Sequence, residues 1–183
     1  MFIQTEQTPN PATLKFLPGC AVMNAGTANF TDAAAAAARS PLAERLFGLP
    51  DVSGVFFGGD FITVTKAGDS DWFQLKPAVL AAIMDHFTAG LPIVTGSDDA
   101  AAPSDAEDNE VVAAIKELLE TRVRPAVAQD GGDIIFEDFE DGIVYLHMQG
   151  SCSGCPSSTA TLKAGIENML RHYIPEVVEV RAV

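Results

Sequence analysis

The sequence is poor in basic residues, in cysteine and in long apolar runs. Its 25 aspartates and glutamates outnumber its 11 lysines and arginines, which gives a formal net charge of −14. Binding to phosphate backbones needs clustered basic side chains, so nucleic acid is not expected as a partner. No apolar run approaches the ~20 residues that cross a bilayer, so a membrane is not expected as a partner either.

A secretory signal and a disulfide framework are also missing. The opening "MFIQTEQTPNP" has neither the cationic segment nor the apolar core of such a signal. The three cysteines, Cys20, Cys152 and Cys155, form an odd set that does not suggest disulfide pairing. We therefore expect a cytoplasmic protein with reduced thiols. The isolated Cys20 is expected to be a small, partly buried apolar residue.

The composition is that of a globular protein, with 48% hydrophobic residues in 183. This length can hold two small domains that each bury a modest core. The stretch "TGSDDAAAPSDAED" at 95–108 is acidic and has no aromatic or large aliphatic side chain, so it cannot collapse into a core. The sequence therefore predicts a domain over 1–94, a flexible acidic linker over 95–106 and a second domain over 107–183.

The first domain is predicted to mix strands and helices. Short strands are expected in "FIQTEQ" and "ATLKFLPG", helices over 33–38 and from Pro41, a hairpin turning at 58–60, and a long helix from about Asp71. Five apolar residues at near-helical spacing are expected to face the core from that long helix: Phe73, Leu80, Ile83, Met84 and Phe87. Because no acid, base, nucleophile or phosphate-binding loop stands out here, we expect a partner-docking role, with a purely stabilising role as the alternative.

The second domain is predicted to follow the order helix, strand, strand, helix, strand. Its first helix is expected to have one side marked by Val111, Ile115, Leu118, Leu119 and Arg122, and Pro125 is expected to stop or kink it. Two strands meet near 141–142, a helix begins at Pro156, and "EVVEVRAV" closes the domain. The fold class is therefore expected to be α+β, with a three-stranded sheet backed by two helices.

The segment "HMQGSCSGCPSST" at 147–159 places Cys152 and Cys155 between a strand and a helix. Amides at the start of a helix and the helix dipole favour thiolate over thiol, and the small residues around the pair leave room for a bound group. Thiol–disulfide exchange, zinc binding and iron–sulfur cluster binding all use such a pair. A thioredoxin-type enzyme needs roughly half a domain after the motif, whereas only 28 residues follow Cys155.

Zinc and a cluster both require more donors than this pair supplies. A structural zinc site takes four nitrogen or sulfur ligands, and His147 is the only nearby histidine; His86, His147 and His172 are each expected to be ordinary residues. An iron–sulfur cluster normally takes four thiolates, which two chains could supply together at a two-fold axis. The spacing alone does not choose between zinc and a cluster.

The surrounding sequence resembles a known family. "QDGGDIIFEDFEDGIVYLHMQGSCSGCPSSTATLKAGIENMLRHYIPEVVEV" is similar to the NifU-like C-terminal domain of the Nfu iron–sulfur scaffold proteins, including the D-G-G-D turn at 130–133 and the G-x-C-x-x-C-P-x-S-x-x-T core at 150–161. "MFIQTEQTPNPATLKFLPG", "RSPLAERLFGLPDVSGVFFGGDFITVTK" and "DWFQLKPAVLAAIMDHFTAGLPIV" resemble the N-terminal domain of the same proteins. The resemblance covers nearly everything except the linker.

The resemblance implies a carrier of a cluster rather than an enzyme. Cys152 and Cys155 match the ligands of the family's cluster, and Gly150, Gly154 and Pro156 match its supporting loop. The implied cargo is a [4Fe-4S] cluster, with a [2Fe-2S] form left open, bridged between two chains of a homodimer. The implied partners are recipient apoproteins and upstream assembly proteins, and Cys20 stays outside the site. Since the chain starts at the family's opening phrase, a bacterial cytoplasmic member without a transit peptide is expected.

Overall fold

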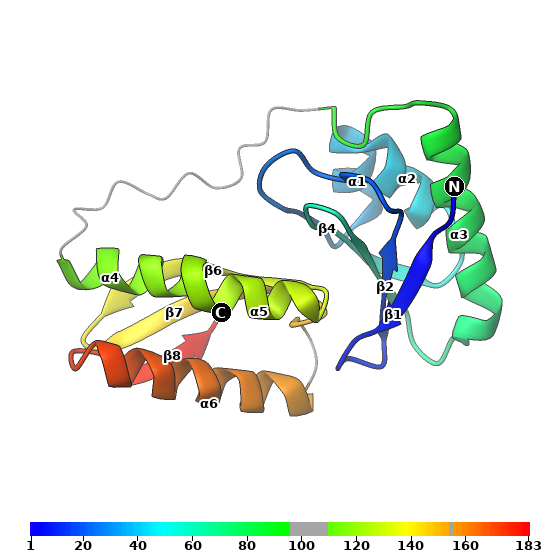
Figure 1. The fold of residues 1–183 in the computed structure, drawn as a ribbon. Helices are drawn as coiled ribbons and strands as arrows, with labels where there is room; N and C mark the ends of the chain where they lie inside the picture. The colour runs from blue at the N-terminus through cyan, green and yellow to red at the C-terminus, as the bar shows by residue number, and fades with distance from the viewer. Residues whose placement is uncertain (96–109, 154–155) are drawn as a thin grey trace. The chain divides into compact units, whose positions relative to one another are not determined.

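The computed structural model describes residues 1–95, 110–153 and 156–183, with the backbone alone for 156–159. The chain divides into two compact units, Met1–Ala100 and Ala101–Val183 (Figure 1). Apart from Thr95, the predicted linker at 95–106 lies outside the described residues, so its limits and those of the adjoining domains stay predictions. Within the described ranges, no helix combines the length and the apolar character needed to cross a membrane.

The first unit is built on a five-stranded antiparallel sheet in the order β1-β2-β5-β4-β3. Its strands are β1 (Gln4–Gln7), β2 (Thr13–Leu17), β3 (Ala28–Phe30), β4 (Val52–Phe57) and β5 (Ile62–Lys66). The two predicted N-terminal strands and the hairpin β4–β5 are confirmed. The sequence did not predict β3, because three residues are too few to show an alternating pattern.

Three helices accompany this sheet: α1 (Ala33–Arg39), α2 (Pro41–Phe47) and α3 (Trp72–Thr88). Their starts are fixed by capping side chains. Asp32 accepts a hydrogen bond from the Ala35 amide at 2.8 Å, and the Ser40 hydroxyl accepts one from the Ala43 amide at 3.0 Å. Asp71 caps α3 in the same way. These caps satisfy amides that have no partner inside the helix.

The helices and the sheet share one hydrophobic core, and α3 faces it with a side that overlaps the predicted one: Ile83 is buried, and Leu80 and Phe87 pack against the core. Phe73 is 85% exposed and Met84 is 41% exposed, so the prediction that both belong to the core is wrong. The buried side of α3 consists of Leu75, Val79, Ala82, Ile83 and His86. The sequence prediction followed the largest apolar side chains, whereas the helix turns smaller ones and a histidine inward.

The second unit has the predicted order of elements and the predicted α+β class. It contains α4 (Glu110–Leu118), η1 (Leu119–Val123), α5 (Arg124–Gln129), β6 (Gly132–Glu140), β7 (Ile143–Gly150), α6 (Pro156–Tyr173) and β8 (Glu179–Ala182). The sheet order is β6-β7-β8, with β6 antiparallel and β8 parallel to β7. Asp141 and Gly142 join β6 to β7 with φ of 51° and 79°, as a tight hairpin turn requires.

The segments α4, η1 and α5 follow one another without a break, and Pro125 does not end the helix. The Arg124 amide donates to the carbonyl of Leu119, five residues earlier, which defines the π-helical segment η1. This widened turn accommodates Pro125, which has no amide hydrogen to donate. The wider turn also rotates the residues that follow it, so Val123 rather than Arg122 faces the core. Arg122 is exposed, and the prediction that it lies on the same side of the helix as the buried residues is wrong.

The continuous helical segment α4–η1–α5 and the helix α6 cover the same face of the three-stranded sheet. The core joins residues from the first helical region, the sheet and α6, namely Ile115, Leu119, Val123, Val127, Ile134, Val144, Leu146, Met148, Ile166, Leu170 and Val180. Burial alternates along β7, where every second residue from Val144 to Met148 is buried. One end of this sheet, where β6 begins and β7 ends, positions the cysteine motif.

Candidate thiol site at the end of β7

Cys152 lies just beyond β7, in a turn that begins with a left-handed glycine. Gly150 has φ of +63°, and the Ser153 amide donates to its carbonyl at 3.1 Å. The Cys152 side chain is buried, with 5% of the residue exposed, and it belongs to the hydrophobic core of the second unit. The other predicted ligand, Cys155, and the supporting Gly154 lie outside the described residues.

The sulfur of Cys152 occupies space that the missing side chain of Gly132 leaves open. A Cβ atom placed on Gly132 would lie 2.5 Å from Cys152 Sγ, 2.9 Å from the Gln149 carbonyl oxygen and 3.0 Å from the Cys152 amide nitrogen. Carbon atoms do not approach sulfur so closely without strain, because close-packed interiors tolerate little added volume. Glycine is therefore the residue that lets this thiol sit against the start of β6.

Ser151 ties the cysteine turn to the D-G-G-D turn at 130–133. The Ser151 amide donates to the Gly131 carbonyl at 3.2 Å, and its hydroxyl donates to the Asp130 carbonyl. Gly131 has φ of +81°, a conformation that favours glycine. Since Ser151 is itself buried, these bonds also satisfy its polar groups. The two turns therefore hold each other through backbone atoms.

An ion pair anchors the D-G-G-D turn to the helix α5. Arg124 Nε and Nη2 donate to Asp133 Oδ1 and Oδ2, each at 2.8 Å, and the Ile134 amide donates to Oδ1 at 2.8 Å. Asp133 is only 3% exposed, so this bidentate pair compensates a buried charge. The hydrogen bonds that Arg124 donates to Asp133 raise the pKa of its guanidinium above the ordinary value, and Glu120 contributes in the same direction.

Sequence reasoning singled out the D-G-G-D turn through the family resemblance, but it gave no role to Arg124, Asp133 or Ser151. A usable signal was present, because Asp133 opens the otherwise apolar run "DIIF" and an acid in such a place needs a partner. The partner itself could not be deduced from spacing. Arg124 reaches Asp133 only because η1 sets the phase of the helix that carries it.

Cys20 and His86 belong to the first unit, whereas Cys152 and His147 belong to the second. Cys20 is exposed in the first unit, so the prediction that it is partly buried is wrong. His86 is buried in the first unit with Nε2 3.0 Å from the Pro92 carbonyl, and His147 Nδ1 lies 3.1 Å from the carbonyl of the C-terminal Val183. Among the described residues, no three His, Cys, Asp or Glu side chains gather into a metal site.

Comparisons with known proteins give matches along most of the chain. Residues 3–90 match the family model described as the scaffold protein Nfu/NifU N terminal, and residues 115–181 match the NifU-like domain. The human protein named NFU1 iron-sulfur cluster scaffold homolog, mitochondrial, is 57% identical in an alignment that covers 100% of this chain and 72% of the relative. NifU-like protein 4, mitochondrial, of Arabidopsis thaliana is 55% identical, with 97% and 64% covered.

The chain is therefore shorter than these relatives, and it spans less than two thirds of the Arabidopsis protein. Among solved structures, the NifU-like protein from Saccharomyces cerevisiae, determined by solution NMR, is 24% identical to the present chain. That alignment covers 52% of this chain and 85% of the yeast chain, with a TM-score of 0.47.

The expectation of a bacterial cytoplasmic location is wrong. The human, Arabidopsis and Drosophila virilis relatives, which are 53% to 57% identical to this chain, are all named as mitochondrial proteins. The expectation depended on the first residues of the sequence. A transit peptide is removed after import and leaves no mark on the domains that follow it, so those residues carry no information on location.

Proposed function

Because the chain belongs to the Nfu family of iron–sulfur cluster scaffold proteins, we propose that it holds a [4Fe-4S] cluster on Cys152 and Cys155 and delivers it to recipient apoproteins. In this role the cluster is a cargo that upstream assembly proteins supply. The chain is then a carrier rather than an enzyme, since no substrate is turned over.

The number of sulfur donors is the observation that carries the proposal. A [4Fe-4S] cluster takes four cysteine thiolates. The whole chain has three cysteines, and one of them, Cys20, is an exposed residue of the first unit. Two chains that each contribute Cys152 and Cys155 supply four donors, so the loaded protein is proposed to be a homodimer with the cluster at its two-fold axis. A [2Fe-2S] cluster needs the same number.

We expect Cys152 to be buried in the empty protein and to become exposed when the cluster is loaded. Its sulfur lies against Gly132, and hydrogen bonds of Ser151 attach the turn that carries it. Each such bond contributes only about 1 kcal/mol to the stability of the turn. We expect cluster loading to include an outward rotation of the turn, because a buried sulfur cannot be shared with a second chain.

Anaerobic reconstitution tests the proposal directly. Loaded protein should be brown, should contain about four irons per dimer, and should have the mass of two chains. Cys152→Ala and Cys155→Ala should each abolish cluster retention, while Cys20→Ala should leave it intact. A loaded protein that remains monomeric would refute the shared site. About two irons per dimer would assign a [2Fe-2S] cargo instead of the cubane.

The two competing functions predict different behaviour in the same preparation. A thiol–disulfide oxidoreductase would be colourless and would reduce a test disulfide at catalytic rates. A zinc module would hold its metal in air and unfold when the metal is chelated. Either result would exclude the carrier role.

A further inference from the structure

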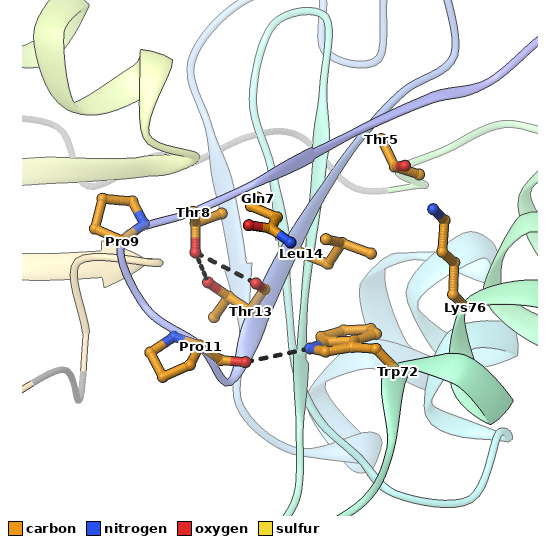
Figure 2. A pocket seen from close by; sticks show the side chains of 9 residues that line it. All are labelled: Thr5, Gln7, Thr8, Pro9, Pro11, Thr13, Leu14, Trp72 and Lys76. Atoms are coloured by element: carbon orange, nitrogen blue, oxygen red, sulfur yellow. Dashed lines mark hydrogen bonds between the residues drawn. The ribbon is translucent and has the colours of Figure 1, made fainter.

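The first unit contains a cavity that the cluster site does not use. It lies between the strand β1 and the helix α3 and has a volume of about 570 Å³ (Figure 2). Thr5 and Gln7 of β1 and Trp72 and Lys76 of α3 form opposite sides, and Leu14 of β2 lines it between them. Ligand sites in proteins commonly have volumes of about 300–1,000 Å³, so this cavity is large enough to bind a group.

One end of the cavity is held rigid by the turn between β1 and β2. Thr8 Oγ1 donates to the Asn10 carbonyl at 2.8 Å, and Asn10 Oδ1 accepts from the Ala12 amide at 3.0 Å. Trp72 Nε1 donates to the Pro11 carbonyl at 3.2 Å, which fixes the indole ring at the cavity wall. These bonds preorganise the wall, and a preorganised site loses less entropy when a partner binds.

Three polar side chains in the cavity remain available to a partner. Within residues 1–95, 110–153 and 156–183, neither a hydrogen bond nor an ion pair engages the Lys76 ammonium, the Thr5 hydroxyl or the Gln7 amide. Lys76 is a cation in a strongly acidic chain, yet no carboxylate of the described residues forms an ion pair with it. A group with a negative charge is therefore the complement of this end of the cavity.

The strand beside the cavity is also an open edge of the sheet. β1 is the terminal strand of the order β1-β2-β5-β4-β3, and among the described strands it pairs with β2 alone. An edge strand presents backbone N–H and C=O groups outward, and an extended peptide can add to such an edge as a further strand. The available cation, the apolar wall and the open edge thus lie together.

We infer that this cavity docks an extended segment of a partner protein, which adds along β1 and places a carboxylate beside Lys76 and an apolar side chain on Leu14 and Trp72. The spacing agrees with this geometry. Trp72 and Lys76 are four residues apart on α3, which is about 6 Å along the helix axis. Alternate residues of a strand, which point to the same face, are about 6.6–6.8 Å apart. The segment should therefore carry an acidic residue two positions from a large apolar one.

A peptide-display selection tests this inference. A library of random linear peptides is selected on the immobilised full chain and, in parallel, on Lys76→Glu and on the matched control Lys66→Glu, which reverses a lysine charge on β5. Selection on the full chain and on Lys66→Glu should enrich an acidic residue two positions from a large apolar one. Selection on Lys76→Glu should lose the acidic preference in favour of a basic residue at that position.

A selected peptide then gives a quantitative measurement. Replacing its acidic residue by the corresponding amide, or replacing Lys76 by Ala, should each weaken binding about tenfold, and both changes together should weaken it little further. No enriched spacing, or the same motif on Lys76→Glu, would overturn the inference. Binding of free glutarate that depends on Lys76, without any peptide motif, would also overturn it in favour of a small anion.

This inference does not depend on the proposed cluster site. Lys76→Glu should leave iron content and dimer mass unchanged after reconstitution, because its side chain lies in the first unit and the thiols lie in the second. Loss of peptide binding and loss of cluster binding are therefore separate results.

Discussion

Replacing Gly132 by alanine should destabilise the second unit through a direct collision with Cys152. The added Cβ would lie 2.5 Å from Sγ and within 3.0 Å of two backbone atoms, so both the cysteine turn and the start of β6 must shift. Overpacking of this kind costs about 1–3 kcal/mol, partly offset by about 0.5–1 kcal/mol because alanine restricts the unfolded chain. We expect a net loss of about 1–2 kcal/mol in the stability of the second unit.

The two units can be followed separately in denaturant. The single tryptophan, Trp72, is in the first unit, and both tyrosines, Tyr145 and Tyr173, are in the second. Gly132→Ala should move the unfolding transition seen by tyrosine emission and leave the tryptophan transition in place. Gly165→Ala is the matched control: it lies on α6 with nothing within 4 Å of the added Cβ, so it should stabilise by about 0.5–1 kcal/mol.

A double-mutant cycle identifies the sulfur as the collision partner. In a Cys152→Ala background the cost of Gly132→Ala should fall, with a coupling of about 1 kcal/mol, although the backbone contacts keep it above zero. If Gly132→Ala behaved like Gly165→Ala, or if its cost were the same with and without the sulfur, the packing argument would be refuted.

Three further expectations concern the ion pair, a buried histidine and the hairpin turn. Arg124→Met should lower the stability seen by tyrosine emission by about 3 kcal/mol, because it leaves the buried Asp133 carboxylate without its cation; a second change, Asp133→Asn, should recover part of that loss. Burial lowers the pKa of His86 below 6.5, so protonation favours unfolding, and the stability of the first unit should decrease as the pH falls below 6.5. This decrease, followed by tryptophan emission, should be absent in His86→Phe. Gly142→Ala should cost about 1–2 kcal/mol in urea unfolding, because Gly142 has φ of +79°; an unchanged midpoint would contradict this.

Local patterns were enough to predict most of the fold. Caps at Asp32, Ser40 and Asp71, and the 141–142 turn, are set by short-range chemistry that a sequence displays directly. The buried sides of two helices were harder to predict, since they depend on tertiary packing. Phe73 is exposed because packing selected the smaller Leu75 and Val79 for the core. Arg122 is exposed because a π turn, which no sequence pattern announced, rotated its helix.

The sequence displays the cysteines of the candidate site but not the residues that support Cys152. The paired cysteines and the glycine-rich turn were visible as a motif, and the family resemblance gave them a joint role. That Cys152 packs into the space above Gly132 could not be read from the sequence, because it joins the first residue of β6 to the turn after β7. The pairing of Arg124 with Asp133 likewise depends on three-dimensional proximity.

The π turn at Leu119–Val123 has a mechanical effect on everything beyond it. The buried residues Ile115, Leu119, Val123 and Val127 follow one another at intervals of four, a repeat that would drift by about 40° per step around a regular α-helix. If the same residues formed a regular α-helix without the π turn, the segment that follows would swing by about 100° around the helix axis. The guanidinium of Arg124 would then point away from the Asp133 carboxylate. The π turn therefore lets one continuous helix contribute side chains to the core and also support the thiol turn.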